Sequence, residues 1–338
     1  MNSDQKKSLI KYLKNRLVCT GELTLTALTG GVSNLTYRLS DGEQQWIVRT
    51  SPSGTKAKGA HDMVREYNLL KSLSEYYVLS PKVYFLIDDL DIFPRPVYVM
   101  EAIEGIEVHR KLPDIYQTTD QKKLCHALIN AQLQLHQVPL NETLQVYNMG
   151  RGYIKRQISG WVKRYKNVQP NHNRADMLIH WLQKNLPTDN KPYALIHNDF
   201  KFDNLIFDTQ NPTQIIGVLD WEMATVGDPL MDLGCSLAYW IQANDHPSTQ
   251  AIRTQPTTEN GMLTRDEYVH EYCRLSGIQL DNYDFYYVYG LFRLTVIVQQ
   301  IYYRYQQGQT NDQRFKPFGD IRDILINHSL QQIGDINV

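Results

Sequence analysis

Residues 195–207 read LIHNDFKFDNLIF, a polar centre between two apolar ends. The apolar runs at 194–196 and 205–207 predict two short buried strands. The loop between them holds imidazole, carboxylate, ammonium and amide groups. Because unpaired buried charges are costly, these groups must pair with one another or line a cleft. This stretch therefore indicates a chemical role more than a stabilising one.

A turn and a third apolar strand follow the polar loop. Residues 208–212 have the composition of a turn, and the apolar run at 215–219 ends at Asp220. A hairpin of this kind would bring Asp220 back beside Asn204. An aspartate and an asparagine at a strand end suit a hard divalent cation, which takes oxygen ligands. Asp199, earlier in the loop, would then orient a hydroxyl group and accept its proton.

The spacing H-x-D-x-x-x-x-N from His197 to Asn204, followed by Asp220, is the phosphoryl-transfer pattern of kinase-like enzymes. On these residues the sequence resembles the aminoglycoside phosphotransferase family. It resembles more closely the branch whose kinase-like domain is fused to acyl-CoA dehydrogenases in some organisms. The resemblance covers nearly the whole chain. A polar turn between two core strands is the alternative interpretation of the stretch.

The resemblance implies a two-lobed, protein-kinase-like α+β fold, with ATP between the lobes. Residues 1–103 would form a small N-terminal lobe with an antiparallel sheet, and residues 104–338 a mainly helical C-terminal lobe. Strand-like patterns and a helical pattern support the first lobe. The strands are expected at 23–28, 35–39, 46–50, 78–87 and 96–100, and the helix at 60–74.

A glycine-rich turn joins the first two predicted strands. Glycines let backbone N–H groups approach phosphate oxygens closely, and neighbouring polar side chains add donors. The predicted nucleotide contacts here are Gly30, Gly31, Ser33 and Asn34. An ordinary hairpin turn explains the same residues without a ligand.

Arg49 stands at the strand position where kinase-like folds usually carry a phosphate-pairing lysine. Arginine can hold phosphate oxygens bidentately, so it can keep that role. The resemblance implies that Glu66, on the predicted helix, pairs with Arg49. Lys56 and Lys58 are alternative cations for the phosphate groups. Arg49 could also be an ordinary solvated arginine at a strand end, with no role in binding.

Residues 97–105 resemble the hinge under which an adenine ring lies, with backbone contacts from Glu101 to Ile103. Further on, helical patterns cover 121–136, 153–168, 175–186 and 283–306. Asp228 and Pro229 predict a helix start, and Thr264 to Glu267 a capping box. The irregular stretch 244–262 is a candidate lid.

The resemblance also assigns the remaining roles in the site. Asp199 is the catalytic residue, and Asn204 and Asp220 are the ligands of Mg²⁺. His197 and Asp232 would brace the loop. Lys201 would neutralise the transferring group, and Glu222 would support the metal.

Composition limits the other classes of function. The net charge is −1, which gives no electrostatic footprint for nucleic acid or an anionic membrane. The four cysteines form no C-x-x-C pair, so reduced thiols are expected. No apolar run is long enough to span a bilayer, and residues 1–15 lack the apolar core of a signal peptide. We therefore expect a cytoplasmic protein.

The predicted function is ATP-dependent transfer of the γ-phosphoryl group to a hydroxyl group of a small molecule. The acyl-CoA dehydrogenase branch favours a hydroxyacyl-CoA or a related acid. The alternatives are a non-catalytic nucleotide-binding regulatory module, an antibiotic kinase of the aminoglycoside type, and a metal-dependent phosphoesterase using His197 and Asp199. Aminoglycosides are polycations, and the basic helix with Arg156 and Arg164 argues against them. The fold alone does not fix the acceptor.

Overall fold

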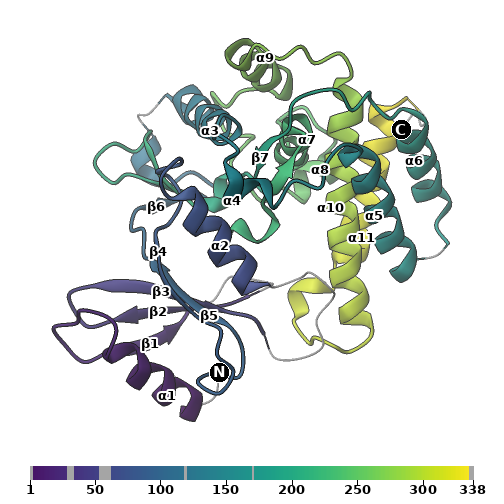
Figure 1. The fold of residues 1–338 in the computed structure, drawn as a ribbon. Helices are drawn as coiled ribbons and strands as arrows, with labels where there is room; N and C mark the ends of the chain where they lie inside the picture. The colour runs from purple at the N-terminus through teal and green to yellow at the C-terminus, as the bar shows by residue number, and fades with distance from the viewer. Residues whose placement is uncertain (1–2, 29–33, 53–61, 118–119, 170, 335–338) are drawn as a thin grey trace. The chain divides into compact units, whose positions relative to one another are not determined.

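The computed structural model describes residues 3–28, 34–52, 62–117, 120–169 and 171–334. The chain forms two compact units. The small unit comprises Met1–Gly105 together with Ile216–Glu222, and the large unit comprises Ile106–Ile215 and Met223–Val338. Figure 1 labels the helices and most strands, and each unit is described by itself below.

The small unit contains an antiparallel sheet in the order β1-β2-β3-β5-β4. Its strands are β1 (Thr24–Ala27), β2 (Leu35–Ser40), β3 (Gln45–Thr50), β4 (Val83–Ile87) and β5 (Val97–Glu101). The predicted antiparallel sheet is confirmed, but the strand expected at 78–87 begins at Val83. Backbone turns occupy the preceding residues, where Tyr77 N donates to Leu73 O and Ser80 N to Tyr77 O. Pro81 then supplies no N–H for a ladder.

Two helices pack on this sheet. Helix α1 (Ser3–Lys14) inserts Leu9 and Leu13 into one core cluster with Leu39, Trp46 and Val48. Helix α2 (Met63–Leu73) begins at Asp62, whose side chain accepts from Arg65 N, and it contacts β4 and β5. Helix α2 lies within the range 60–74 where a helix was predicted.

The segment Ile216–Glu222 is attached to the small unit by specific bonds. It includes most of strand β9 (Ile215–Val218) and the start of the 3₁₀ turn Trp221–Met223. Val218 N donates to Leu79 O at 2.7 Å, and Trp221 Nε1 donates to Val218 O at 2.7 Å. The buried Trp221 ring also meets Tyr77 edge-on, with centroids 5.8 Å apart. These contacts fix the backbone on both sides of Asp220.

The large unit is mainly helical. Two short antiparallel pairs hold the central loops: β7 (Ala194–Ile196) with β10 (Thr225–Gly227), and β6 (Ile106–Glu107) with β8 (Leu205–Phe207). Its helices are α3 (Gln121–His136), α4 (Glu142–Gln145), α5 (Tyr153–Val168), α6 (Asn173–Lys184), α7 (Pro229–Ala238), α8 (Pro247–Ala251), α9 (Arg265–Ser276), α10 (Tyr283–Gln306) and α11 (Phe318–Gln332). None of the helices in the described ranges is long and apolar enough to cross a bilayer.

Most predicted helix boundaries in the large unit are confirmed. Helices α3, α5 and α10 have the expected bounds, Asp228 caps α7, and Thr264 forms the capping box of α9. Helix α6 starts two residues earlier than expected because the His172 side chain accepts from Ala175 N and caps it.

The stretch 244–262, the candidate lid, contains the short helix α8 and otherwise consists of turns and irregular backbone. It is pinned by buried polar contacts. Arg265 binds both carboxylate oxygens of Asp245 at 2.6 Å, and Thr257 Oγ1 donates to Ile241 O at 2.5 Å. The Gln255 side chain, also buried, accepts from Phe202 N at 2.9 Å. The polar composition of this stretch does not show which of its polar side chains are buried and hydrogen-bonded.

Helices α7 and α10 cross in direct backbone contact. A Cβ atom at Gly290 would lie 1.9 Å from Gly234 O, and one at Gly234 would lie 2.0 Å from Tyr286 O. Backbone cannot move aside as a side-chain tip can. Both glycines are therefore required for this crossing, which positions two helices that carry residues of the candidate site described below.

We predict that Gly290→Ala lowers the free energy of unfolding by about 1–3 kcal/mol, the usual cost of overpacking. Gly160→Ala is the matched control, because a Cβ atom there meets only the flexible Arg164 tip at 3.4 Å. In the interior of α5 this control should stabilise by about 0.5–1 kcal/mol. Urea unfolding measures both. A neutral Gly290→Ala would show that the helices can separate without cost.

Candidate active site

Arg49 is the centre of a charged cluster in the small unit. Its strand pairs it with Tyr98 of β5, and its side chain is buried. Arg49 Nη1 lies 2.9 Å from Glu66 Oε1, and Nη2 lies 2.6 Å from Asp220 Oδ1. Glu222 Oε2 is 3.8 Å from the same nitrogen. The sequence-predicted residues Arg49, Glu66, Asp220 and Glu222 are thus brought together in one unit.

Burial and charge oppose each other in this cluster. Burial by itself would lower the pKa of Arg49, but the charges of Glu66 and Asp220 raise it well above its usual value. Burial raises the pKa of Glu66, and the Arg49 charge counters part of that rise. Arg49 is therefore a permanent cation that faces two acidic side chains. Its guanidinium group can bind phosphate oxygens if they compete with these carboxylates for it.

The other predicted residues of the small unit lie near strand ends. Asp220 has a left-handed backbone, φ 65°, which is rare outside glycine and turns its carboxylate toward Arg49. Asn34 Nδ2 donates to Glu222 Oε2 at 2.7 Å. Glu101 ends β5 and accepts from Lys82 N at 3.1 Å, and Ile103 is half-buried just beyond it. Gly30, Gly31, Ser33, Lys56 and Lys58 lie outside the described residues.

In the large unit, Asp199 is held by two neighbours from its own loop. Its Oδ2 atom lies 3.0 Å from Lys201 Nζ and accepts from Asn204 Nδ2 at 2.9 Å. Asn204 Nδ2 also donates to the Asp199 carbonyl at 2.8 Å. The buried Phe202 anchors the 3₁₀ turn Phe202–Asn204 by stacking on Phe207, with centroids 6.2 Å apart. The Asp199 carboxylate therefore has a fixed direction.

Asp232 lies beneath this loop and is fully buried. It accepts from His197 N at 3.3 Å and from Asn198 N at 2.5 Å. Asn198 has a left-handed backbone, φ 65°. His197, itself buried, accepts from Asp199 N through Nδ1 at 3.2 Å. The strained backbone and the buried acceptor together define the turn that presents Asp199.

Asp199 is ionised at neutral pH. Burial tends to raise its pKa, but the charges of Lys201 and Arg293 outweigh burial and hold the pKa at about 2. A carboxylate with so low a pKa is a weak base toward a free alcohol. It can still accept a hydrogen bond from a hydroxyl group, orient that group, and take the proton late in a reaction.

Four contributors to this site were missed from the sequence. Gln132 Nε2 donates to Asp232 at 3.1 Å, and His136 Nε2 lies 2.9 Å from the same carboxylate. Both residues stand on α3 four positions apart, so they share a helix face, and that spacing was the available signal. The others are Tyr239, whose ring lies 4.4 Å from Lys201 Nζ, and Arg293. No sequence pattern singled these two out.

The predicted Mg²⁺ ligands have the right chemistry. Asn204 uses its amide nitrogen on Asp199, which leaves its amide oxygen for another partner. Asp220 uses Oδ1 on Arg49, which leaves Oδ2. Hard oxygen donors of this kind fit Mg²⁺, which keeps several waters and needs few protein ligands. Among the described residues, no three or more His, Cys, Asp and Glu side chains are arranged as a set that could hold a metal ion.

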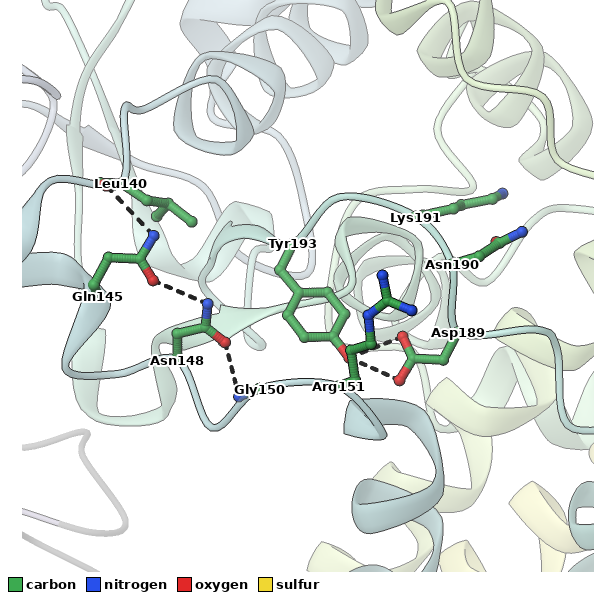
Figure 2. Close-up of a pocket in the computed structure, with 9 residues that line it drawn as sticks. All are labelled: Leu140, Gln145, Asn148, Gly150, Arg151, Asp189, Asn190, Lys191 and Tyr193. Atoms are coloured by element: carbon green, nitrogen blue, oxygen red, sulfur yellow. Dashed lines mark hydrogen bonds between the residues drawn. The ribbon is translucent and has the colours of Figure 1, made fainter.

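A separate pocket of about 350 Å³ opens in the large unit. Figure 2 shows Tyr193 at its centre, with the hydroxyl group bonded to both oxygens of Asp189 at 2.7 and 2.8 Å. Arg151 and Lys191 also line it. None of the predicted site residues contributes to its wall.

The profile of the phosphotransferase enzyme family matches residues 24–286 of this chain. Among curated proteins, acyl-CoA dehydrogenase family member 10 from Mus musculus is 33% identical over 326 residues, which cover 94% of this chain. The chain spans only 30% of that relative's length. The predicted resemblance to the phosphotransferases and to their acyl-CoA dehydrogenase-linked branch is confirmed.

Solved structures give the same fold. A Ralstonia eutropha protein, provisionally described as an aminoglycoside phosphotransferase, has a TM-score of 0.81 at 23% identity, covering 98% of this chain and 99% of its own. Plasmodium vivax ethanolamine kinase has a TM-score of 0.64 at 15% identity, covering 96% and 86%. At these identities the likeness concerns the fold alone. The predicted kinase-like α+β fold is confirmed.

We predict that Lys201→Met raises the pKa of Asp199, because burial remains and the main opposing charge is lost. In the wild type the folded pKa, about 2, lies below the unfolded value of 3.8, so Asp199 contributes a constant stability above about pH 5. In the variant the folded pKa should exceed the unfolded one. Stability should then fall as pH rises, by about 1.4 kcal/mol per pKa unit.

Urea unfolding at pH 4 to 7 measures this difference. The gap between wild type and Lys201→Met should widen toward pH 7. Adding Asp199→Asn to Lys201→Met removes the titrating carboxyl group and should remove the widening. A gap that stays constant with pH would contradict the proposed control of Asp199 by Lys201.

Proposed function

The chain belongs to the phosphotransferase enzyme family, and from that premise we propose that it transfers the γ-phosphoryl group of ATP to a hydroxyl group of a small molecule. One observation carries the proposal. Lys201 and Asn204 fix the Asp199 carboxylate, and the loop that carries it donates a backbone hydrogen bond to buried Asp232. Phosphoryl transfer depends on positioning and charge neutralisation more than on covalent help from the protein. A fixed, ionised carboxylate meets the first need.

Each residue of the two clusters has a part in this proposal. Asp199 orients the acceptor hydroxyl group and takes its proton as the new ester bond forms. Lys201, at 3.0 Å, limits the build-up of negative charge beside it. Arg49, held by Glu66, binds phosphate oxygens of ATP. The glycine-rich turn through Asn34 and the backbone from Glu101 to Ile103 hold the rest of the nucleotide. The proposed lobes remain 1–103 and 104–338.

Mg²⁺ belongs to the proposal as well. Asn204 and Asp220 would hold it through their remaining oxygen atoms, with Glu222 in support. When bound, the ion neutralises phosphate charge and lowers the barrier to transfer. Arg49 must then share Asp220 with the metal, and its contact with Glu66 keeps it in place when it does.

For the acceptor, we propose a hydroxyacyl-CoA or a related hydroxy acid. The similarity to an acyl-CoA dehydrogenase family member supports this class, although the chain spans 30% of that relative. Helix α5 carries exposed Arg156 and Arg164, which disfavour a polycationic antibiotic. A regulatory module that binds ATP without transfer is the second candidate. The direct contact of Arg49 with the predicted metal ligand Asp220 is the observation that favours it.

We predict that Asp199→Asn lowers acceptor-dependent turnover by about 10²–10⁴-fold, the usual contribution of a proton acceptor. Affinity for ATP should change little, because the variant keeps the side-chain volume and the small unit. Asp208→Asn is the control, since Asp208 only accepts backbone bonds in a surface turn. Coupled measurement of ADP release gives the rates. Normal turnover by Asp199→Asn with a verified acceptor would contradict the assignment.

We further predict that ATP binding requires Mg²⁺ and that Asp220→Asn weakens the Mg²⁺ dependence by about tenfold or more, as loss of a charged metal ligand does. The amide can still accept from Arg49, so the cluster should persist. Isothermal calorimetry of ATP with and without Mg²⁺ tests both statements. Binding that is equal with and without the ion would argue against the metal site.

A further inference from the structure

The pocket around Tyr193 in the large unit has no part in the proposed phosphoryl transfer. Its volume, about 350 Å³, falls in the range of roughly 300–1,000 Å³ that small-molecule sites usually have. Two segments of the chain form its wall, one within residues 140–151 and one within 189–193. In Figure 2, the uncharged Leu140 and Gln145 lie on one side of Tyr193, and the charged residues lie on the other. The pocket therefore has a defined lining and no assigned ligand.

Cationic groups of this pocket have hydrogen-bond donors to spare. Among the residues that the structure describes, the Arg151 guanidinium forms neither an ion pair nor a hydrogen bond. Lys191 Nζ donates to Gln279 O at 2.9 Å, which leaves its other N–H groups. Arg156 adds a third positive charge at the rim, where its Nη2 donates to the Gly150 carbonyl at 2.6 Å. Arg151 and Lys191 thus keep donors that a ligand can use.

The two carboxylates nearby already have donors of their own. The Asp189 oxygens accept from the Tyr193 hydroxyl group and from Gly152 N. Asp228 is 2% exposed and accepts from a backbone N–H at the start of α7. It interacts electrostatically with Lys191, without an ion pair between them. Because neither carboxylate neutralises the cationic donors by direct contact, the pocket favours an anion.

Apolar side chains accompany the cationic ones. Leu140 lines the pocket, and Val146 and Met149 are 71% and 75% exposed. Both of these exposed residues are sequence neighbours of residues in the pocket wall. Covering apolar surface of this kind with an apolar group is favourable. A ligand that combines an anionic group with an apolar part would therefore use both features.

We propose that the pocket binds a small organic anion, whose carboxylate or phosphate group accepts from Arg151 and Lys191 and whose apolar part lies against Leu140. The inference goes beyond the proposed phosphoryl transfer and does not depend on it. Inorganic phosphate would leave the apolar wall uncovered, and a neutral or cationic molecule would leave the cationic donors unused. The two features together define the class of ligand.

The pocket is joined directly to the strands that carry the Asp199 loop. Tyr193 immediately precedes β7, which leads into His197. Asn148 forms a bridge with Val226 of β10, the strand that pairs with β7. A ligand that contacts both segments of the wall should therefore restrain β7 and β10. The backbone amides of these strands should then exchange more slowly with solvent.

The probes are hexyl phosphate and heptanoate, which present the two anionic groups on similar chains. Hexanol and hexyltrimethylammonium are the neutral and cationic controls, and inorganic phosphate is the headgroup alone. Isothermal calorimetry measures the dissociation constants for wild type, Arg151→Glu, Lys191→Met and a control, Lys163→Met, which removes an exposed charge of α5 outside the pocket. The titrations are repeated with saturating ATP and Mg²⁺. Hydrogen exchange across β7 and β10 is measured with and without probe.

Wild type should bind at least one of the two anions, and the three controls about tenfold more weakly or not at all. Arg151→Glu and Lys191→Met should each weaken anion binding by about tenfold or more, the effect of losing a hydrogen bond to a charged group. Lys163→Met should stay within about twofold, as expected of an exposed cation. Binding should persist in ATP, and exchange in β7 and β10 should slow.

Arg151 is exposed, so its substitution should leave the fold intact and decides the test if Lys191→Met does not fold. No binding of either anion, equal binding of hexanol, or an affinity that Arg151→Glu leaves unchanged would overturn the inference. Displacement of the probe by ATP, or unchanged exchange in both strands, would also place it at another site. A protein that transfers no phosphoryl group can still pass every one of these measurements, so failure of the proposed function is distinguishable.

Discussion

The geometry of the large-unit site depends on one buried acceptor, the carboxylate of Asp232. It takes the N–H groups of two successive loop residues, and one of them, Asn198, has a left-handed backbone. Burial raises the pKa of Asp232, but its hydrogen bonds and the charge interaction with His136 lower it below the usual value. The carboxylate thus stays ionised, which strengthens each bond it accepts. Without this acceptor, the N–H groups of His197 and Asn198 would lose their hydrogen bonds, and the loop that positions Asp199 would lose its support.

In the small unit, the buried charged group at the centre of the site is a cation, Arg49. Arg49 is buried between Glu66 and Asp220, so the charges compensate one another at the cost of their hydration. Such a pair adds little to stability, which favours a ligand-binding explanation for it. In contrast, the well-satisfied Arg265–Asp245 pair in the large unit ties a connecting segment in place. The same pairing chemistry therefore serves binding in one place and structure in the other.

Local patterns predicted much of this protein. The capping box at Thr264, the periodicity of α10 and the alternation of the first strands all depend on neighbours in sequence, and all are confirmed. Arg293 could not be found in this way, because its burial results from the packing of α10 on other helices. Gln255, which accepts a hydrogen bond from Phe202 N, could not be distinguished from the other polar residues of its stretch for the same reason. The roles of the site residues remain predictions, and the glycine-rich turn lies outside the described residues.

The central claim is that the chain makes a phosphate ester. Phosphorus-31 NMR of the reaction of wild-type protein with ATP, Mg²⁺ and hydroxy acids or their thioesters tests it most directly. The account predicts a new phosphomonoester signal that grows with ADP in equal amount and disappears when Mg²⁺ or the hydroxyl group is omitted. Conversion of ATP to ADP and inorganic phosphate alone, with no ester from any acceptor, would contradict it.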